Sequence, residues 1–193
     1  MSNLISLSRP ALLTRGKITV LVSVDTDVVH QLIAWAVGHT DSADCTVTVI
    51  DCRCSFNATR VLELIHLEHI YFKQAMDSIQ VSRPFTAYQY QASTNNLLQK
   101  RPPPNSPIVI MSALHLLYDD NIQLGESMRL LRCLLADFQR LCHRAPLTLT
   151  VALPPADMKA RLCLLNALTT MADQVIAPET SVQQAPFQQG LLI

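Results

Sequence analysis

Two aspartates, Asp25 and Asp27, follow the apolar run of residues 18–24 and are the first side chains in the sequence that could do chemistry. One carboxylate in such a pair can attack phosphorus while the other acts as acid and base, and both can hold Mg²⁺. This reaction also needs a later lysine and a further acidic pair, for which Asp119 and Asp120 are the candidates. The pair therefore raises the hypothesis of a small phosphatase.

A structural role competes with this hypothesis. Asp25 or Thr26 can cap a helix that begins near Val28, because short polar side chains accept hydrogen bonds from the first N–H groups of a helix. The required lysine is also hard to place, since none of the lysines stands at the end of a predicted strand: Lys17, Lys73, Lys100 and Lys159. We therefore favour the capping role.

A second candidate is a metal site. Cys52, Cys54, His66 and His69 form the pattern C-x-C-x11-H-x2-H, and thiolates and imidazoles are ligands that zinc accepts. Zinc fingers have at least two residues between their cysteines and occur in domains with little core of their own. We therefore expect buried cysteines, surface histidines and no bound metal.

Two histidines each follow a polar side chain by three residues. His30 follows Asp27 and His115 follows Ser112, so each could serve as a general base. Neither pattern contains a third group that would orient the imidazole. We expect both histidines to be structural.

The elements that must position these side chains alternate between strand and helix patterns. Short β-branched runs predict strands at residues 18–24, 46–50, 78–82, 108–111, 147–153 and 174–176. Apolar residues at helical spacing predict helices at 28–37, from 58 onward, 67–76, 86–99, 124–143 and 158–171. This alternation indicates an α/β fold with a mainly parallel sheet flanked by helices. In such sheets the functional crevice lies beyond the carboxyl ends of the strands.

The helix at residues 124–143 has a basic stripe opposite its apolar face. Leucine, methionine and phenylalanine gather on one half of the helical wheel, and four arginines gather on the opposite third: Arg129, Arg132, Arg140 and Arg144. Arginine suits interfaces and phosphate contact. The stripe is a candidate surface for a partner or for DNA, with a solvated helix face as the alternative.

Composition excludes several classes of function. The chain has 193 residues, of which 49% are hydrophobic and 16% are charged, with fifteen basic residues against fifteen acidic ones. Without net charge, no overall field attracts nucleic acid or membranes. Only four glycines are present, and they are scattered, so the sequence contains no glycine-rich phosphate loop. The low charge favours association with a protein partner through surplus apolar surface.

The sequence also bears on location. No apolar run reaches the ~18 residues needed to cross a bilayer. The six cysteines stand in apolar or helical contexts, which is typical of reduced thiols used as small hydrophobic residues. We expect a cytoplasmic protein, or a nuclear one if the source is eukaryotic.

Several segments, taken in order, resemble the ATPase core of the RecA-like recombinase superfamily, in particular its small divergent paralogues. Residues 15–19 are similar to the start of that family's first core strand. Residues 51–56, followed by Arg60, resemble the family segment D-T-E-G-T-F and its continuation R-x-x-R-L. Residues 79–85 resemble the next strand, and residues 108–112 occupy the place of the Walker B strand. The resemblance covers about residues 15–176.

The departures from the family pattern are systematic. The family's glycine-rich P-loop with its lysine is replaced by a short segment containing Asp25 and Asp27, Arg53 stands where the family has its catalytic glutamate, and Met111 replaces the Walker B aspartate. Phosphoryl transfer depends on these elements together. The resemblance thus implies a core without catalytic residues, cofactor or ATP binding.

The resemblance further implies a hetero- or homo-oligomeric subunit that assists DNA recombination or repair beside another recombinase-like or accessory protein. The family's DNA-binding loops would fall near residues 118–125 and 154–161, where Lys159 and Arg161 are the only cations. We expect an N-terminal segment at 1–14, the core at 15–178 and a tail at 179–193. In the alternative function, Asp25-Thr26-Asp27 resembles the motif of haloacid-dehalogenase-like phosphatases.

Overall fold

The computed structural model describes residues 12–38, 46–67, 75 and 77–177. They form an α/β fold with one six-stranded sheet in the order β3-β2-β4-β5-β1-β6, and every strand pair is parallel. The strands are β1 (Ile18–Val22), β2 (Val47–Asp51), β3 (Ile79–Ser82), β4 (Ile108–Met111), β5 (Leu147–Val151) and β6 (Gln174–Ile176). The predicted fold class is confirmed.

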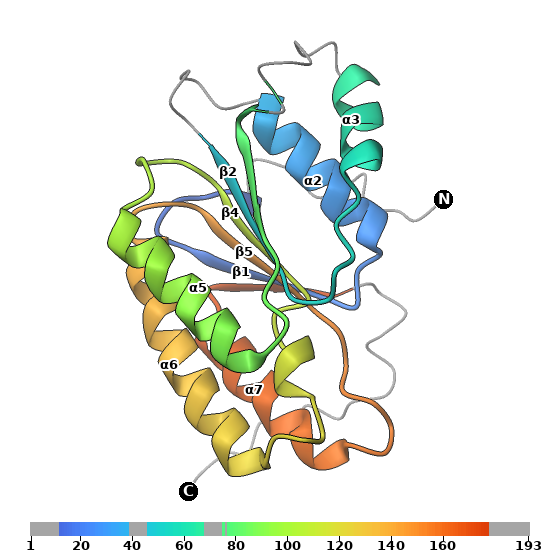
Figure 1. The fold of residues 1–193 in the computed structure, drawn as a ribbon, viewed down its shortest axis with the longest axis vertical. Coiled ribbons are helices and arrows are strands. Elements are labelled where there is room, and N and C mark those ends of the chain that lie inside the picture. The colour runs from blue at the N-terminus through green and yellow to red at the C-terminus, as the bar shows by residue number, and fades with distance from the viewer. Residues whose placement is uncertain (1–11, 39–45, 68–74, 76, 178–193) are drawn as a thin grey trace, which may run out of the picture.

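Helices cover both faces of this sheet (Figure 1). One face carries α2 (Thr26–Gly38) and α3 (Ala58–Leu67), and the other carries α5 (Ala87–Lys100), α6 (Leu124–Cys142) and α7 (Leu162–Met171). Two short 3-10 helices, η1 (His115–Leu117) and η2 (Lys159–Arg161), lie in the connections.

The two faces of the sheet bury alternate residues of each strand, as the period of two in a strand requires. In β4, Ile108 and Ile110 pack into the core on the α5–α6–α7 side, whereas Val109 and Met111 pack beneath α2 and α3. Strands buried on both faces read as continuous apolar runs. This is why the sequence marks β1, β2, β4 and β5 clearly.

Several element boundaries differ from the prediction. The first strand ends at Val22, two residues early, because Ser23 adopts φ 53° and its N–H donates to Val151 O at 2.8 Å. The predicted helix 158–171 is split into η2 and α7, and most of the helix predicted at 67–76 lies outside the described residues. In the part of the chain that the structure describes, no helix is long and apolar enough to span a membrane.

The carboxyl ends of three strands lead into sharp turns at one edge of the sheet. Ser23 follows β1, Ser112 follows β4, and Cys54 lies shortly after β2; each adopts a positive φ of 53–55°. Asp51, at the end of β2, is in register with Met111 at the end of β4. This edge holds the segments that the sequence selected for chemistry and is therefore the candidate site.

Candidate functional site

The turn between β1 and α2 is closed by Asp25. Its Oδ1 accepts the N–H of Asp27 at 3.0 Å, and its carbonyl oxygen accepts the N–H of Val28 at 3.1 Å. Only Ser23, Val24 and Asp25 separate the strand from the helix. Asp25 rather than Thr26 therefore provides the contacts that begin the helix.

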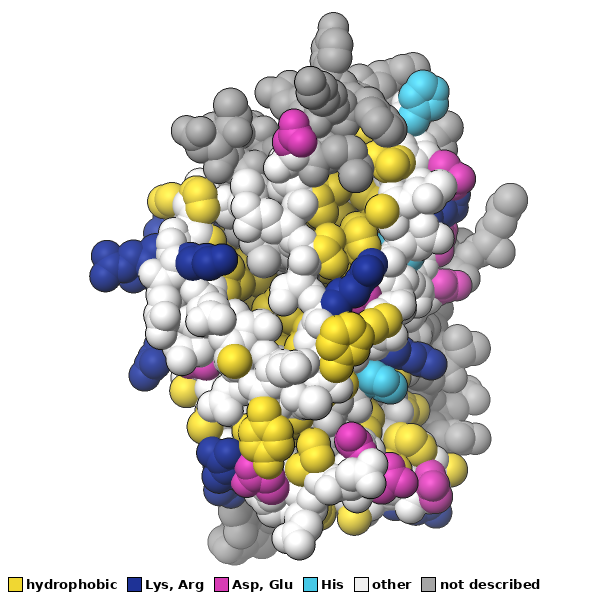
Figure 2. Space-filling view, in the orientation of Figure 1, with side chains coloured by type: hydrophobic (Ala, Val, Ile, Leu, Met, Phe, Trp, Pro, Cys, Tyr) yellow, Lys and Arg dark blue, Asp and Glu magenta, His cyan; other side chains and the backbone are white. Residues whose placement is uncertain are grey.

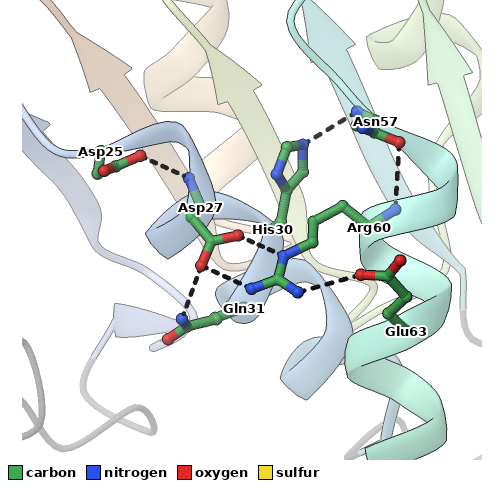
Figure 3. A network of polar contacts seen from close by, with 7 residues as sticks. All are labelled: Asp25, Asp27, His30, Gln31, Asn57, Arg60 and Glu63. Atoms are coloured by element: carbon green, nitrogen blue, oxygen red, sulfur yellow. Dashed lines mark hydrogen bonds and ion pairs between the residues drawn. The ribbon is translucent and has the colours of Figure 1, made fainter. Parts of the chain in front are cut away.

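Asp27 is held by a two-pronged ion pair with Arg60, which lies on α3 (Figure 3). Arg60 Nε lies 2.6 Å from Asp27 Oδ1 and Nη2 lies 3.0 Å from Oδ2, while Gln31 Nε2 donates to the same Oδ2 at 3.2 Å. Glu63 holds the remaining side of the guanidinium, with Oε2 3.1 Å from Nη1. Both carboxylate oxygens of Asp27 are thus engaged.

The Arg60 guanidinium holds the pKa of Asp27 below the ordinary value for aspartate. We expect Arg60→Gln to raise this pKa toward ~3.9. A depressed carboxyl pKa stabilises the fold above the unfolded-state pKa, and this contribution is lost as the pH falls through the folded-state value. The wild type and the variant should therefore differ in stability at neutral pH and converge in strong acid.

NMR titration of the Asp27 carboxyl group and unfolding curves across the acid range would measure this effect. Glu63→Gln is the matched control, because Glu63 contacts Arg60 and has no contact with Asp27 among the hydrogen bonds described. An unchanged Asp27 pKa in Arg60→Gln would contradict the assignment.

His30 joins the same two helices and is structural, as expected. Its Nε2 accepts the backbone N–H of Asn57 at 3.0 Å, which requires the neutral imidazole, and its ring meets Phe56 edge-on at 5.9 Å. Burial lowers the pKa of His30 and so favours this neutral form. Asn57 caps α3 by accepting the N–H of Arg60 at 3.1 Å.

Asp51 organises the loop after β2. Its side chain is fully buried and accepts the backbone N–H groups of Arg53 at 3.2 Å, Ser55 at 3.1 Å and Phe56 at 2.8 Å. Arg83 lies beside it, with Nε 3.8 Å from Asp51 Oδ2. The carboxylate is engaged inside the protein, while the Arg53 side chain points away from the core and is exposed.

The end of β4 is also closed. Met111 is 1% exposed, so its thioether belongs to the core. The N–H of Ser112 donates to Thr150 Oγ1 at 2.8 Å, and its carbonyl accepts the N–H of His115. Burial, together with the nearby Arg53, lowers the pKa of His115.

The residues of the predicted phosphatase site and of the predicted metal site do not come together in the structure. No three cysteine, histidine or acidic side chains gather around a common point in the described segments. Cys52 is buried, Cys54 and His66 are exposed, and His69 lies outside the described residues. Asp119 accepts both the backbone and side-chain N–H groups of Asn121.

The predicted contact residues fall into two groups. All four arginines of the predicted stripe are exposed, but Arg144 lies beyond the end of α6 at Cys142. Leu130, Leu134 and Phe138 on the other side of the helix are buried. Within the stripe, Arg129 pairs with Glu126 and Arg140 lies near Asp137. Among the described residues, Arg132 and Arg144 of the stripe form no ion pair, and neither does the exposed Lys159.

Arg161 belongs to the second group, because it is only 8% exposed. Its guanidinium donates to the carbonyls of Leu117, Asp119 and Ile122 and to Ser127 Oγ. Its hydrogen-bonding groups are directed into the protein, so Arg161 is not part of a contact surface. It fixes the loop between η1 and α6 to η2.

Sequence reasoning did not identify the partners that close the edge. Arg60 and Arg83 appeared only within segments of the resemblance. Both meet carboxylates 32 or 33 residues earlier in the chain, a separation at which spacing carries no signal. A search with this sequence found no matching family model and no matching curated protein.

Proposed function

We propose that this protein is a non-enzymatic interaction subunit built on a RecA-like core without a nucleotide site. In this proposal it is an accessory factor in DNA recombination or repair that acts through hetero- or homo-oligomerisation. The parallel sheet supports the proposal, because the segments that depart from the family pattern, with Asp25, Arg53 and Met111, lie at the carboxyl ends of β1, β2 and β4. The parts of a nucleotide site would have to meet there.

The observation that carries the proposal is the closed turn between β1 and α2. A helix N-terminus that follows a strand can bind phosphate through its free N–H groups and its dipole. Here Asp25 accepts the N–H groups of Asp27 and Val28, and Asp27 adds a second carboxylate that is locked to Arg60. The carboxylate of Asp25 and the ion pair between Asp27 and Arg60 stand where a polyphosphate would have to bind.

The other two catalytic positions support the same conclusion. The side chain of Arg53 cannot accept a proton from water as a carboxylate does. Met111 offers a thioether, and magnesium prefers oxygen ligands. Because nucleotide hydrolysis requires positioning and charge compensation together, the loss of all three groups leaves no source of catalysis at this edge.

Surface composition supports a role in association. Large apolar side chains are exposed around both edge strands of the described sheet, with Val81 of β3 40% exposed, Phe85 after it 72% exposed and Val175 of β6 44% exposed. Apolar side chains also lie open on the face shown in Figure 2. Exposed apolar side chains at the edge strands of a sheet are open to association with another chain.

We expect no saturable binding of ATP, with or without Mg²⁺, when a fluorescent ATP analogue is titrated into the purified protein and followed by anisotropy. The carboxylate of Asp25 repels phosphate and occupies the N–H of Asp27, and Arg60 is already paired with Asp27. Magnesium-dependent affinity that unlabelled ATP competes away would overturn the inactive-core assignment.

The interaction role is tested by purification from the native source under mild conditions, followed by identification of co-purifying proteins by mass spectrometry. We expect a stoichiometric partner, and we expect the chain expressed alone to self-associate in size-exclusion chromatography. Recovery of a monodisperse monomer without a partner from both sources would contradict the proposal.

A further inference from the structure

Six basic side chains lie at the end of the sheet opposite the candidate site. They come from three segments that each lead into the amino end of a strand: residues 15–17 before β1, 100–105 before β4 and 140–144 before β5. In Figure 2, dark blue side chains gather on the left of the molecule, where α5 and α6 end in Figure 1. We call these six exposed side chains the basic surface: Arg15, Lys17, Lys100, Arg101, Arg140 and Arg144.

Backbone hydrogen bonds hold the three segments of the basic surface together. The N–H of Gly16 donates to the carbonyl of Cys142 at 2.8 Å, which joins the first segment to the end of α6. The N–H of Asn105 donates to the carbonyl of Arg144 at 3.3 Å, which joins the loop after α5 to the same place. Cations from distant parts of the chain are therefore fixed side by side on one surface.

Little negative charge balances the basic surface. Among the described residues, Arg140 is the only one of the six with an ion pair, its Nη1 lying 3.7 Å from Asp137 Oδ1. Arg15 donates instead to a backbone carbonyl, that of His143, at 3.2 Å. The carboxylate of Asp173, next to the start of β1, accepts a backbone N–H of that strand at 2.7 Å. The zero net charge of the chain thus conceals a local excess of positive charge.

The end of α5 adds free hydrogen-bond acceptors to this surface. The last carbonyl groups of a helix have no partner within the helix. Helix α5 ends at Lys100, Arg101 adopts φ 52°, and three prolines follow at 102–104. Proline has no N–H, and among the described residues no N–H from outside the helix donates to these last carbonyls. They are open to a partner that brings N–H groups.

The two features together favour an acidic protein segment over nucleic acid. A peptide brings carboxylates, which arginine binds through two parallel hydrogen bonds, and it also brings backbone N–H donors for the end of α5. The phosphates of a nucleic acid can only accept hydrogen bonds. Single strands are held in addition by stacking on aromatic side chains, and none of the three segments contains phenylalanine, tyrosine or tryptophan.

We propose that the basic surface binds an extended acidic segment of a partner protein. The carboxylates of that segment pair with the cations, Arg101 and Arg144 foremost, and its backbone N–H groups reach the carbonyls at the end of α5. Exposed ion pairs are individually weak, so binding depends on several of them acting together on a surface whose backbone is already fixed. The inference rests on the proposed function as an interaction subunit and names the chemistry that the partner presents.

The proposal is tested by titrating the purified full chain into a fluorescein-labelled peptide of alternating aspartate and glutamate, followed by anisotropy. We expect saturable binding that weakens several-fold between about 0.05 and 0.3 M NaCl, since salt screens exposed charges. Arg101→Gln combined with Arg144→Gln should weaken binding about tenfold, because charge-assisted hydrogen bonds are lost. The same peptide with N-methylated amides, which keeps its carboxylates and loses its N–H donors, should bind several-fold more weakly.

Two further variants control for charge and folding. Arg53→Gln combined with Lys159→Gln removes two exposed cations outside the basic surface and should leave peptide binding unchanged. Arg101→Lys combined with Arg144→Lys keeps the charge and should retain most of the binding. Circular dichroism melting at the wild-type temperature shows that each variant is folded.

Equal binding by the wild type and by Arg101→Gln with Arg144→Gln would overturn the proposal. Tighter binding of a DNA duplex with the same number of charges would also overturn it and would assign the surface to nucleic acid. These outcomes are separable from failure of the proposed function. A native partner that co-purifies equally with the double glutamine variant refutes the basic surface and leaves the interaction role standing, whereas absence of any partner refutes that role.

Discussion

Arg161→Met is expected to lower the free energy of unfolding by about 3–5 kcal/mol, because it strands several acceptors that the guanidinium now satisfies together. Three of them are backbone carbonyls in the segment from Leu117 to Ile122, and the fourth is Ser127 Oγ. Methionine can replace the apolar stem of the arginine in this buried position, so the loss isolates the polar contacts. For a domain of this size such a loss is a large fraction of the total stability.

Urea unfolding followed by circular dichroism measures the effect. Lys159→Met is the matched control, since Lys159 lies two residues earlier and is exposed, and exposed substitutions change stability by about 0.5 kcal/mol or less. Arg161→Lys should fall between the two, because an ammonium has fewer donors than a guanidinium. Equal stabilities of Arg161→Met and Lys159→Met would contradict the proposed role of Arg161.

Asp51→Ala is expected to lower the free energy of unfolding by about 3 kcal/mol. The substitution removes the acceptor of three backbone N–H groups and leaves Arg83 beside an uncharged methyl group. Unsatisfied buried donors each cost about 1–3 kcal/mol. The loop after β2, in which Cys54 holds φ 55°, should lose its ordered conformation.

Hydrogen exchange at Ser55 and Phe56 gives a local measurement to accompany the global unfolding curve. Asp51→Asn keeps one acceptor oxygen and should cost less than Asp51→Ala. Asp120→Ala, at an exposed aspartate, is the control for loss of a negative charge. If exchange at Ser55 and Phe56 is unchanged in Asp51→Ala, the carboxylate does not organise this loop.

The strands were predictable because burial on both faces leaves a continuous β-branched run, as in residues 18–22 and 108–111. Alternation with helices then fixed the class, and the rule for parallel sheets directed attention to the correct edge. Residue type predicted a helix cap at Asp25 or Thr26, and the structure assigns it to Asp25. The boundaries of the strands were less predictable. Ser23 ends β1 by adopting a positive φ, and nothing in its residue type indicates this conformation.

The contacts between residues far apart in the chain could not be predicted from the sequence. Arg161 has the sequence context of an exposed loop cation, and its burial depends on carbonyls about forty residues earlier. Arg60 meets Asp27 only because α2 and α3 pack side by side on one face of the sheet.

The position of β1 in the sheet also determines when the protein can fold during translation. This N-terminal strand lies between β5 and β6, which are among the last strands to be synthesised. At ~5–20 residues per second, the ribosome leaves β1 without either neighbour for on the order of ten seconds. Throughout this period the apolar residues of β1 are available to chaperones, and the sheet can close only after residues 147–176 have emerged.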